Sequence, residues 1–153
     1  MDIIVLENNI NNNIKNVNII NNNIYMKKLI NITSNAWNKM SSIIGKSNNQ
    51  YGFLFGVTSG GCNGFNFKLN LMNNSDYESI LKLKPNIFND KDKKVKLYVD
   101  PLSEIYIVGT TIDYINEDIN KGIFESKFVY QVDKKNASSC GCGISFTPKQ
   151  NIL

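Results

Sequence analysis

Residues 51–72 read YGFLFGVTSGGCNGFNFKLNLM, two strand-like runs on either side of a glycine-rich turn. The first run is apolar and aromatic, which is typical of a buried strand. The second run alternates strictly, so the apolar residues from Phe65 to Leu71 occupy one face and asparagine and lysine occupy the other. The stretch therefore predicts two strands, the second of them half-buried, and the turn between them carries Cys62.

Three more runs favour strands: VKLYVD at residues 95–100, TTIDYI at 110–115 and KFVYQV at 127–132. The polar stretch NEDINKG between the last two predicts a loop. Residues 73–94 are polar and rich in lysine, so we expect a long loop there, with a short structured piece around Ile87 and Phe88.

Two helices are expected. Thr33 or Ser34 can cap the first, and Gly45 stands just past its end. Its apolar residues fall on one helical face: Ala36, Trp37, Met40, Ile43 and Ile44. Pro101 stands where the first turn of a short second helix would begin, and Gly109 ends that helix. Closely spaced strands with only two helices predict a mainly β domain.

The chain of 153 residues fits one compact domain and leaves little room for a second core. Residues 1–32 are rich in asparagine, which favours turns and local backbone bonds over helices and strands. We therefore expect residues 1–32 to be a disordered extension. The domain is assigned to residues 33–148, and residues 149–153 form a C-terminal tail.

The net charge is +4, but the chain has no arginine, the residue that binds phosphate and guanine through two parallel bonds. Its lysines are dispersed, apart from KDKKVK at residues 91–96. This composition does not favour a nucleic-acid partner. No run of 18 apolar residues is present, so we expect no membrane-spanning helix.

The first residues, MDIIVLENN, include Asp2 and Glu7 and lack the arginines of a mitochondrial or plastid presequence. They do not resemble a secretory signal either. We expect an intracellular, reducing compartment, which would be the cytoplasm if this N-terminus is native and untargeted. In such a compartment cysteines serve more often as metal ligands or reactive thiols than as disulfides.

Several enzyme classes are excluded by missing residues. The chain has no histidine, so neither a Cys-His pair nor a Ser-His-Asp triad can form. The glycine-rich TSGGCNG lacks the GxxxxGK[ST] pattern of a phosphate-binding loop. No paired carboxylates stand out, and Asp100 and Asp113 are expected to be turn or capping residues. These absences argue against a hydrolase, and we expect a protein that is not an enzyme.

All three cysteines, Cys62, Cys140 and Cys142, lie in turns flanked by glycine. Glycine removes side-chain bulk and lets the backbone bend, so the sulfurs can point at one place. In the Cys-x-Cys pair both thiols can lie on one side of the backbone, whereas a disulfide between them needs a small strained ring. Metal ligation is favoured, with a redox pair and inert buried cysteines as the alternatives. Phe146 is expected to anchor the C-terminal turn against the core.

The number of thiols limits which metal they can hold. Thiolates suit zinc, copper(I) and iron-sulfur clusters, whereas calcium and magnesium need oxygen ligands. A structural zinc site takes four ligands, and one chain offers three cysteines and no histidine. Two protomers bring six cysteines, enough for the four that a [2Fe-2S] or [4Fe-4S] cluster takes. The count favours a cluster shared across a symmetric dimer.

Three segments together resemble the A-type iron-sulfur carriers, the HesB-like or IscA-like family: GGCNGFNFKL at residues 60–69, VDPLSEIYIVGTTIDYI at 99–115 and SSCGCGISF at 138–146. The resemblance covers residues 33–148. It implies a mainly β domain, described for the family as a β-sandwich or half-barrel, and a homodimer or higher oligomer. It also implies that Cys62, Cys140 and Cys142 bind the cluster.

The same resemblance implies a role in iron-sulfur cluster assembly. The chain would hold a [2Fe-2S] or [4Fe-4S] cluster at a subunit interface, take it from a scaffold or a monothiol glutaredoxin, and pass it to apo-proteins by thiol exchange. The glycines beside the cysteines would give the turns freedom to bend. A mitochondrial location is expected from the family.

Three other functions stay open. The same cysteines could hold a mononuclear ion in an iron donor or metal-binding module. Cys140 and Cys142 could form the redox pair of a thiol-disulfide oxidoreductase, although the usual Cys-x-x-Cys at a helix start is absent. The chain could also be an interaction domain in which the cysteines have no role.

Overall fold

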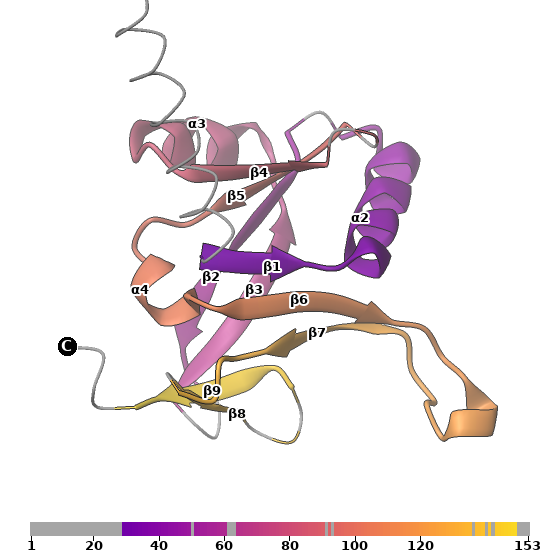
Figure 1. Cartoon of the computed structure of the whole chain (residues 1–153). Coiled ribbons are helices and arrows are strands. Elements are labelled where there is room, and N and C mark those ends of the chain that lie inside the picture. The colour runs from indigo at the N-terminus through magenta and orange to yellow at the C-terminus, as the bar shows by residue number, and fades with distance from the viewer. Residues whose placement is uncertain are drawn as a thin grey trace, which may run out of the picture.

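The computed structural model describes residues 29–49, 51–60, 64–90, 92, 94–135, 137–139, 141 and 143–149. One sheet consists of β2 (Phe53–Ser59), β3 (Phe65–Leu71), β4 (Asn86–Asp90), β5 (Val95–Val99), β8 (Ala137–Ser139) and β9 (Ser145–Pro148). The other consists of β1 (Ile30–Ile32), β6 (Thr110–Ile115) and β7 (Lys127–Gln131). The strand order is β4-β5-β2-β3-β9-β8 in the larger sheet and β1-β6-β7 in the smaller sheet. Figure 1 shows the smaller sheet in front of β2 and β3.

The prediction of a mainly β domain is confirmed, because the two sheets enclose one hydrophobic core. Alternation along each strand sends one set of side chains inward. The buried core residues come from both sheets, the first helix and the helix α4 (Glu104–Ile107), and include Ile30, Ala36, Met40, Phe53, Phe55, Phe67, Leu97, Val99, Ile107, Ile112, Tyr130 and Phe146. Phe55 and Phe146 are fully buried. The predicted alternation of β3 is confirmed, since Phe67 is buried and Lys68 exposed.

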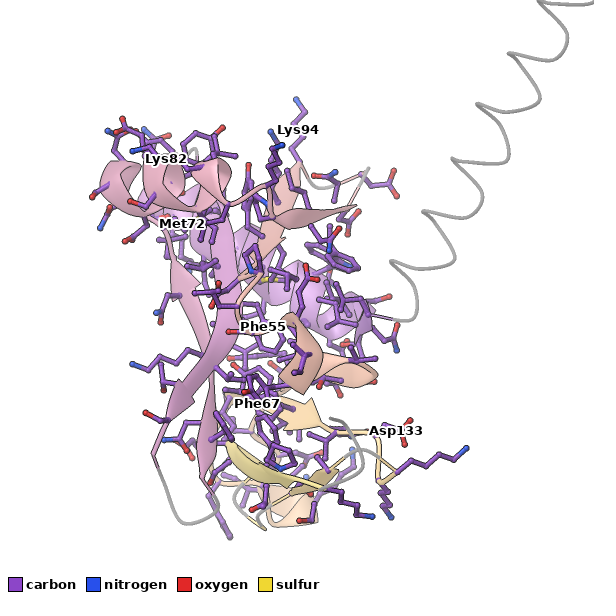
Figure 2. The ribbon with its side chains drawn as sticks, turned by 90° about the vertical axis from the view of Figure 1, so that its left-hand side faces the viewer. Phe55, Phe67, Met72, Lys82, Lys94 and Asp133 are labelled. Atoms are coloured by element: carbon purple, nitrogen blue, oxygen red, sulfur yellow. The ribbon has the colours of Figure 1, made fainter. Side chains whose placement is uncertain are left out.

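Six rings form a continuous aromatic cluster in this core: Phe55, Phe65, Phe67, Tyr106, Tyr130 and Phe146. The Phe67 and Phe146 ring centroids are 4.4 Å apart, and those of Phe65 and Tyr106 are 4.7 Å apart. Tyr130 lies 5.0 Å from Phe67. Figure 2 shows Phe55 and Phe67 in the interior, along β2 and β3. The cluster ties both sheets together.

The first helix, α2 (Ser34–Ser47), begins as predicted at Thr33. The Thr33 hydroxyl accepts a hydrogen bond from Ala36 N at 3.2 Å and donates one to the Asp113 carboxylate. Asp113 was expected to be a turn or capping residue, but it lies in β6, where its carboxylate accepts a hydrogen bond from the hydroxyl of the N-cap residue. The predicted end at Gly45 is wrong. The helix continues to Ser47 and ends at Asn48, whose left-handed φ of 50° asparagine tolerates better than most residues.

The long loop predicted for residues 73–94 is also wrong, since it contains the helix α3 (Asn74–Lys82). Asn73 and Asp76 form a capping box, in which each side chain accepts a bond from the other residue's backbone N–H. The helix covers the outer face of the larger sheet, where Ile80 and Tyr98 are both buried. The short piece predicted around Ile87 and Phe88 is confirmed as β4.

A turn at residues 100–103 leads into α4 (Glu104–Ile107), the predicted short helix. The Asp100 carboxylate accepts bonds from Leu102 N at 3.1 Å and from the Ser103 hydroxyl at 2.7 Å. Ser103 Oγ in turn accepts from Val57 N at 3.0 Å, which fixes the turn to β2. Asp100 is therefore a turn residue, as expected. None of the helices that the structure describes is long and apolar enough to span a membrane.

Three short strands were not predicted. β1 falls inside the stretch assigned to the extension, but it pairs in parallel with β6, and Leu29 and Ile30 are buried. The packed part of the chain therefore includes residues 29–32. Residues 1–28 and 150–153 lie outside the described residues. β8 and β9 have three and four residues, too few for alternation to reveal them.

We predict that Asn73→Ala destabilises the protein by about 1 kcal/mol, because it removes the side-chain half of the capping box of α3. Asn74→Ala is the matched control. Its side chain is exposed and bonds Glu78 one turn later, so its loss should cost less than about 0.5 kcal/mol. Urea unfolding measures both free energies. Equal effects of the two substitutions would contradict the cap.

Burial raises the pKa of Tyr130 from 10.0 to about 12. The folded-state pKa lies above the unfolded value. The stabilisation that comes from the neutral hydroxyl of Tyr130 is therefore complete below pH 10, and it is lost as the pH rises towards 12. At pH 11.5 the wild type should lose about 2 kcal/mol of unfolding free energy relative to Tyr130→Phe. Below about pH 9 the difference between the two proteins should not change with pH. Parallel stability curves up to pH 11.5 would count against this burial.

Candidate functional site

The first glycine-rich turn joins β2 to β3. The two strands pair antiparallel from Phe53 opposite Leu71 to Ser59 opposite Phe65. Gly60 N donates a hydrogen bond to Gly64 O at 2.9 Å and so closes the open end of this hairpin. Both glycines have positive φ, 129° and 97°, a conformation that residues with a Cβ rarely adopt. Cys62, between them in the sequence, lies outside the described residues.

The second turn joins β8 to β9, which pair antiparallel from Ala137 opposite Pro148 to Ser139 opposite Phe146. Gly143 has a φ of 71°, so this turn also needs glycine. Cys140 and Cys142 lie outside the described residues. Their assignment as ligands, like that of Cys62, stays a prediction.

Pairing of β3 with β9 brings the two turns to neighbouring strands. Phe65 stands opposite Phe146, and Asn66 stands opposite Ser145. Phe67 N donates to Ile144 O at 2.9 Å and extends the pairing towards the turn. In the sequence, Phe65 comes three residues after Cys62 and Phe146 four residues after Cys142. The fold thus brings together the segments that adjoin the predicted ligands.

The smaller sheet also holds the second turn, because Tyr130 N of β7 donates to Gly143 O at 3.3 Å. Gly143 directly follows Cys142, and its carbonyl group thereby bonds to a strand of the other sheet. The side chain of Tyr130 belongs to the aromatic cluster, where its ring packs against Phe67 and Phe67 packs against Phe146. The predicted anchoring of the C-terminal turn by Phe146 is confirmed.

Sequence analysis did not single out Tyr106 or Tyr130. Tyr130 shares the inward face of β7 with Phe128, an alternation visible in KFVYQV, but nothing in the sequence shows that this face meets β3. Tyr106 sits in a short helix and stacks on Phe65. Both tyrosine rings pack against phenylalanines of β3, which follows the first turn: Tyr106 against Phe65 and Tyr130 against Phe67.

The described residues offer no other metal site, because no three Cys, His, Asp or Glu side chains among them come together. Asp100 and Asp113 are engaged in the turn and the cap described above. Figure 2 shows Lys82 and Lys94 at the end of the molecule away from β8 and β9, so neither neutralises charge near the second turn. The three cysteines are left as the candidate ligands.

Two curated relatives align with most of the chain. The iron-binding protein IscA of Photorhabdus laumondii is 30% identical over 118 residues, which cover 76% of this chain and 96% of that protein. The iron-sulfur cluster assembly protein SufA of Plasmodium falciparum is 34% identical over 119 residues, 77% of this chain and 62% of that protein. No protein-family model matches the chain.

A crystal structure of IscA with the [2Fe-2S] cluster superposes with a TM-score of 0.55, covering 80% of this chain and 99% of that one. At 13% identity this likeness concerns the fold, and it agrees with the two-sheet architecture. Membership follows from the identity and coverage of the Photorhabdus relative. This chain belongs to the A-type iron-sulfur cluster assembly family, the HesB-like proteins that include IscA and SufA.

Proposed function

We propose that this protein serves iron-sulfur cluster assembly by binding a cluster as cargo through the thiolates of Cys62, Cys140 and Cys142 and passing it to apo-proteins. The observation that carries the proposal is the pairing of β3 with β9, with Phe65 opposite Phe146. It supports convergence of two sequence-distant cysteine segments on one site. The thiolates are the ligands that iron-sulfur clusters require.

The number of ligands supports a homodimer. A [2Fe-2S] or a [4Fe-4S] cluster takes four protein ligands, and one chain supplies three thiolates. Two copies supply six thiolates, so a cluster shared between two protomers obtains its four ligands and leaves two thiols unused. The IscA structure with a [2Fe-2S] cluster supports the smaller cluster as the first form to look for.

Release of the cargo follows from thiol exchange. Thiolates of an apo-protein replace those of the carrier one at a time, and no new bond type is needed because both sides use sulfur. Glycines such as Gly60 and Gly143 let the turns yield while β3 and β9 stay paired. The proposal makes the protein a carrier and not an enzyme. It works in a reducing intracellular compartment, with the mitochondrion as the expected one, between a scaffold or monothiol glutaredoxin and the recipients.

Iron binding without sulfide is the second candidate function. The Photorhabdus relative is named as an iron-binding protein, and three thiolates can hold a single ion. The two functions differ in stoichiometry. A cluster contains acid-labile sulfide in equal number to its iron, and a mononuclear site contains none.

Anaerobic reconstitution of the full chain with iron and sulfide separates the two candidates. We expect visible absorption from sulfur-to-iron charge transfer, equal amounts of iron and acid-labile sulfide, and transfer of both to an apo-ferredoxin. Iron without sulfide would overturn the cluster proposal in favour of the iron-binding function. A retained cluster that never reaches the apo-ferredoxin would overturn the carrier role.

Replacing Cys62, Cys140 or Cys142 by serine, one at a time, should reduce cluster retention at least tenfold, because each change removes one thiolate. The unfolding free energy of the apo-protein should change by less than about 1 kcal/mol, since β3 and β9 pair through other residues. Ser139→Ala is the matched control beside Cys140 and should retain the cluster. Iron and sulfide content and urea unfolding check both expectations. Unfolded apo variants, or full cluster retention without Cys62, would contradict the assignment.

A further inference from the structure

The positive charge of the chain is concentrated in one segment, residues 81–96, which read LKLKPNIFNDKDKKVK. Of the chain's 17 lysines and 13 acidic residues, six lysines and two aspartates fall in this segment, which gives it a net charge of +4. The remaining 11 lysines and 11 acidic residues cancel. The segment therefore carries the whole charge excess of the protein.

The fold brings parts of this segment to one face of the larger sheet. Ile87 of β4 pairs with Tyr98 of β5, and Asn89 pairs with Lys96, so all four side chains lie on the same side of the two strands. This is the face that α3 covers, because Ile80 and Tyr98 are buried together. Ile87 and Lys96 are exposed on the same face.

Large apolar side chains are exposed between the lysines. Leu81 is 40% exposed, Leu83 50% and Ile87 37%. At the end of α3 the leucines alternate with Lys82 and Lys84, which are exposed as well. Exposed apolar side chains that are flanked by charged ones are typical of an interaction site.

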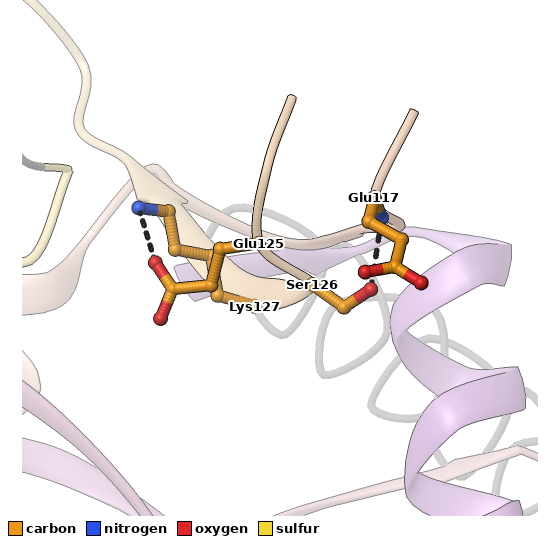
Figure 3. Close-up of polar contacts among 4 residues, drawn as sticks. All are labelled: Glu117, Glu125, Ser126 and Lys127. Carbon is orange, nitrogen blue, oxygen red and sulfur yellow. Dashed lines mark hydrogen bonds and ion pairs between the residues drawn. The ribbon is translucent and has the colours of Figure 1, made fainter. Parts of the chain in front are cut away.

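The lysines of this segment are available to an anionic partner. Within the described part of the chain, no acidic side chain forms an ion pair with Lys82, Lys84 or Lys96. Elsewhere a lysine does form such a pair, since Lys127 Nζ lies 3.2 Å from the Glu125 carboxylate (Figure 3). The positive charge near α3 is thus not offset by ion pairs between described residues.

Two of the lysines occupy backbone positions that suit other residues better. Lys84 and Lys94 both have a φ of 53°, in the left-handed region that glycine and asparagine adopt more easily. Asparagine is abundant in this chain and would fit both positions with less strain. Lysine adds a positive charge there, which favours a role for the charge.

We propose that this surface, the LKLK surface, binds peripherally to a membrane that contains anionic phospholipids. It consists of Leu81, Lys82, Leu83, Lys84, Ile87 and Lys96. The lysine ammonium groups meet the lipid phosphates, and the leucines enter the boundary between headgroups and acyl chains. A nucleic acid fits less well, because it offers exposed leucines no apolar environment and the chain has no arginine to grip its phosphates.

Binding through the LKLK surface leaves the candidate site accessible. Figure 2 shows Lys82 and Lys94 at the end of the molecule away from β8 and β9. The second glycine-rich turn would therefore stand away from the bilayer. The inference does not depend on the proposed function, because the membrane contact uses none of the three cysteines.

Vesicle flotation of the full-length apo-protein tests the proposal. We expect binding to vesicles of phosphatidylcholine with about 30 mol% phosphatidylglycerol, and at least tenfold weaker binding to phosphatidylcholine alone. Salt at about 1 M shortens the Debye length to about 3 Å and should weaken the binding to anionic vesicles at least tenfold. Equal binding to both kinds of vesicle, or binding that salt does not weaken, would overturn the proposal.

Charge reversal tests the location of the contact. The double variant Lys82→Glu, Lys84→Glu should bind anionic vesicles at least tenfold more weakly than the wild type. The matched control is Lys134→Glu, Lys135→Glu, which changes the net charge equally at two exposed lysines beside Asp133. Figure 2 shows Asp133 near the other end of the molecule from Lys82, so the control should bind like the wild type. Equal losses in the two variants would mean that only total charge matters and would overturn the proposal.

The leucines separate a lipid surface from an acidic protein partner, for which polyglutamate is the probe. Leu81→Ser with Leu83→Ser should weaken vesicle binding at least threefold, because serine does not enter the acyl boundary. Leu102→Ser, at a side chain that is 76% exposed before α4, is the control and should have no effect. Circular dichroism should show the same fold in every variant. Binding to polyglutamate without binding to anionic vesicles would overturn the proposal in favour of an acidic protein.

Discussion

Two residue pairs join β3 to β9, and they connect segments that are far apart in the chain. So short a ladder gives few hydrogen bonds, each worth only about 1 kcal/mol net. Ring burial supplies more: Phe146 is fully buried and lies 4.4 Å from Phe67, and complete burial of such a side chain contributes about 1.5–3 kcal/mol. The aromatic cluster therefore determines where β9 lies, and the order of the larger sheet follows from it.

The same packing fixes the frame of the candidate site. The residues that follow the predicted ligands, Phe65 and Phe146, are fixed by pairing and by their rings. The glycines of both turns adopt backbone conformations that restrict the substitutions each turn accepts. The described part of the candidate site is therefore a frame of paired strands whose turns require glycine.

The sequence allowed most strands of the fold to be predicted, because β2, β3, β5, β6 and β7 show runs or alternation long enough to recognise. It did not reveal α3, since Asn73 and Asp76 cap the helix in place of the commoner serine or threonine with glutamate. Because α3 was not predicted, the burial of the second face of β5, where Tyr98 lies, was not predicted either. Pairing between β3 and β9 was beyond prediction because two matched residues leave no periodic pattern.

The candidate ligands were predicted from residue type and glycine context, and local sequence carries that information. Their environment was not predicted. Tyr130 joins the site through its backbone N–H and its ring, and both contacts depend on how the smaller sheet lies against the larger. Such contacts between distant segments are decided by packing, which leaves no local signal.

β7 links the loop at residues 116–126 to the candidate site within five residues. At its first residue, Lys127 pairs with Glu125 of this loop, and near its other end Tyr130 N donates a hydrogen bond to Gly143 O in the second turn. A strand in a sheet is stiff along its length because both faces and its paired edge are held. The Gly143 carbonyl group, next to Cys142 in the sequence, is therefore held in a defined position relative to the smaller sheet.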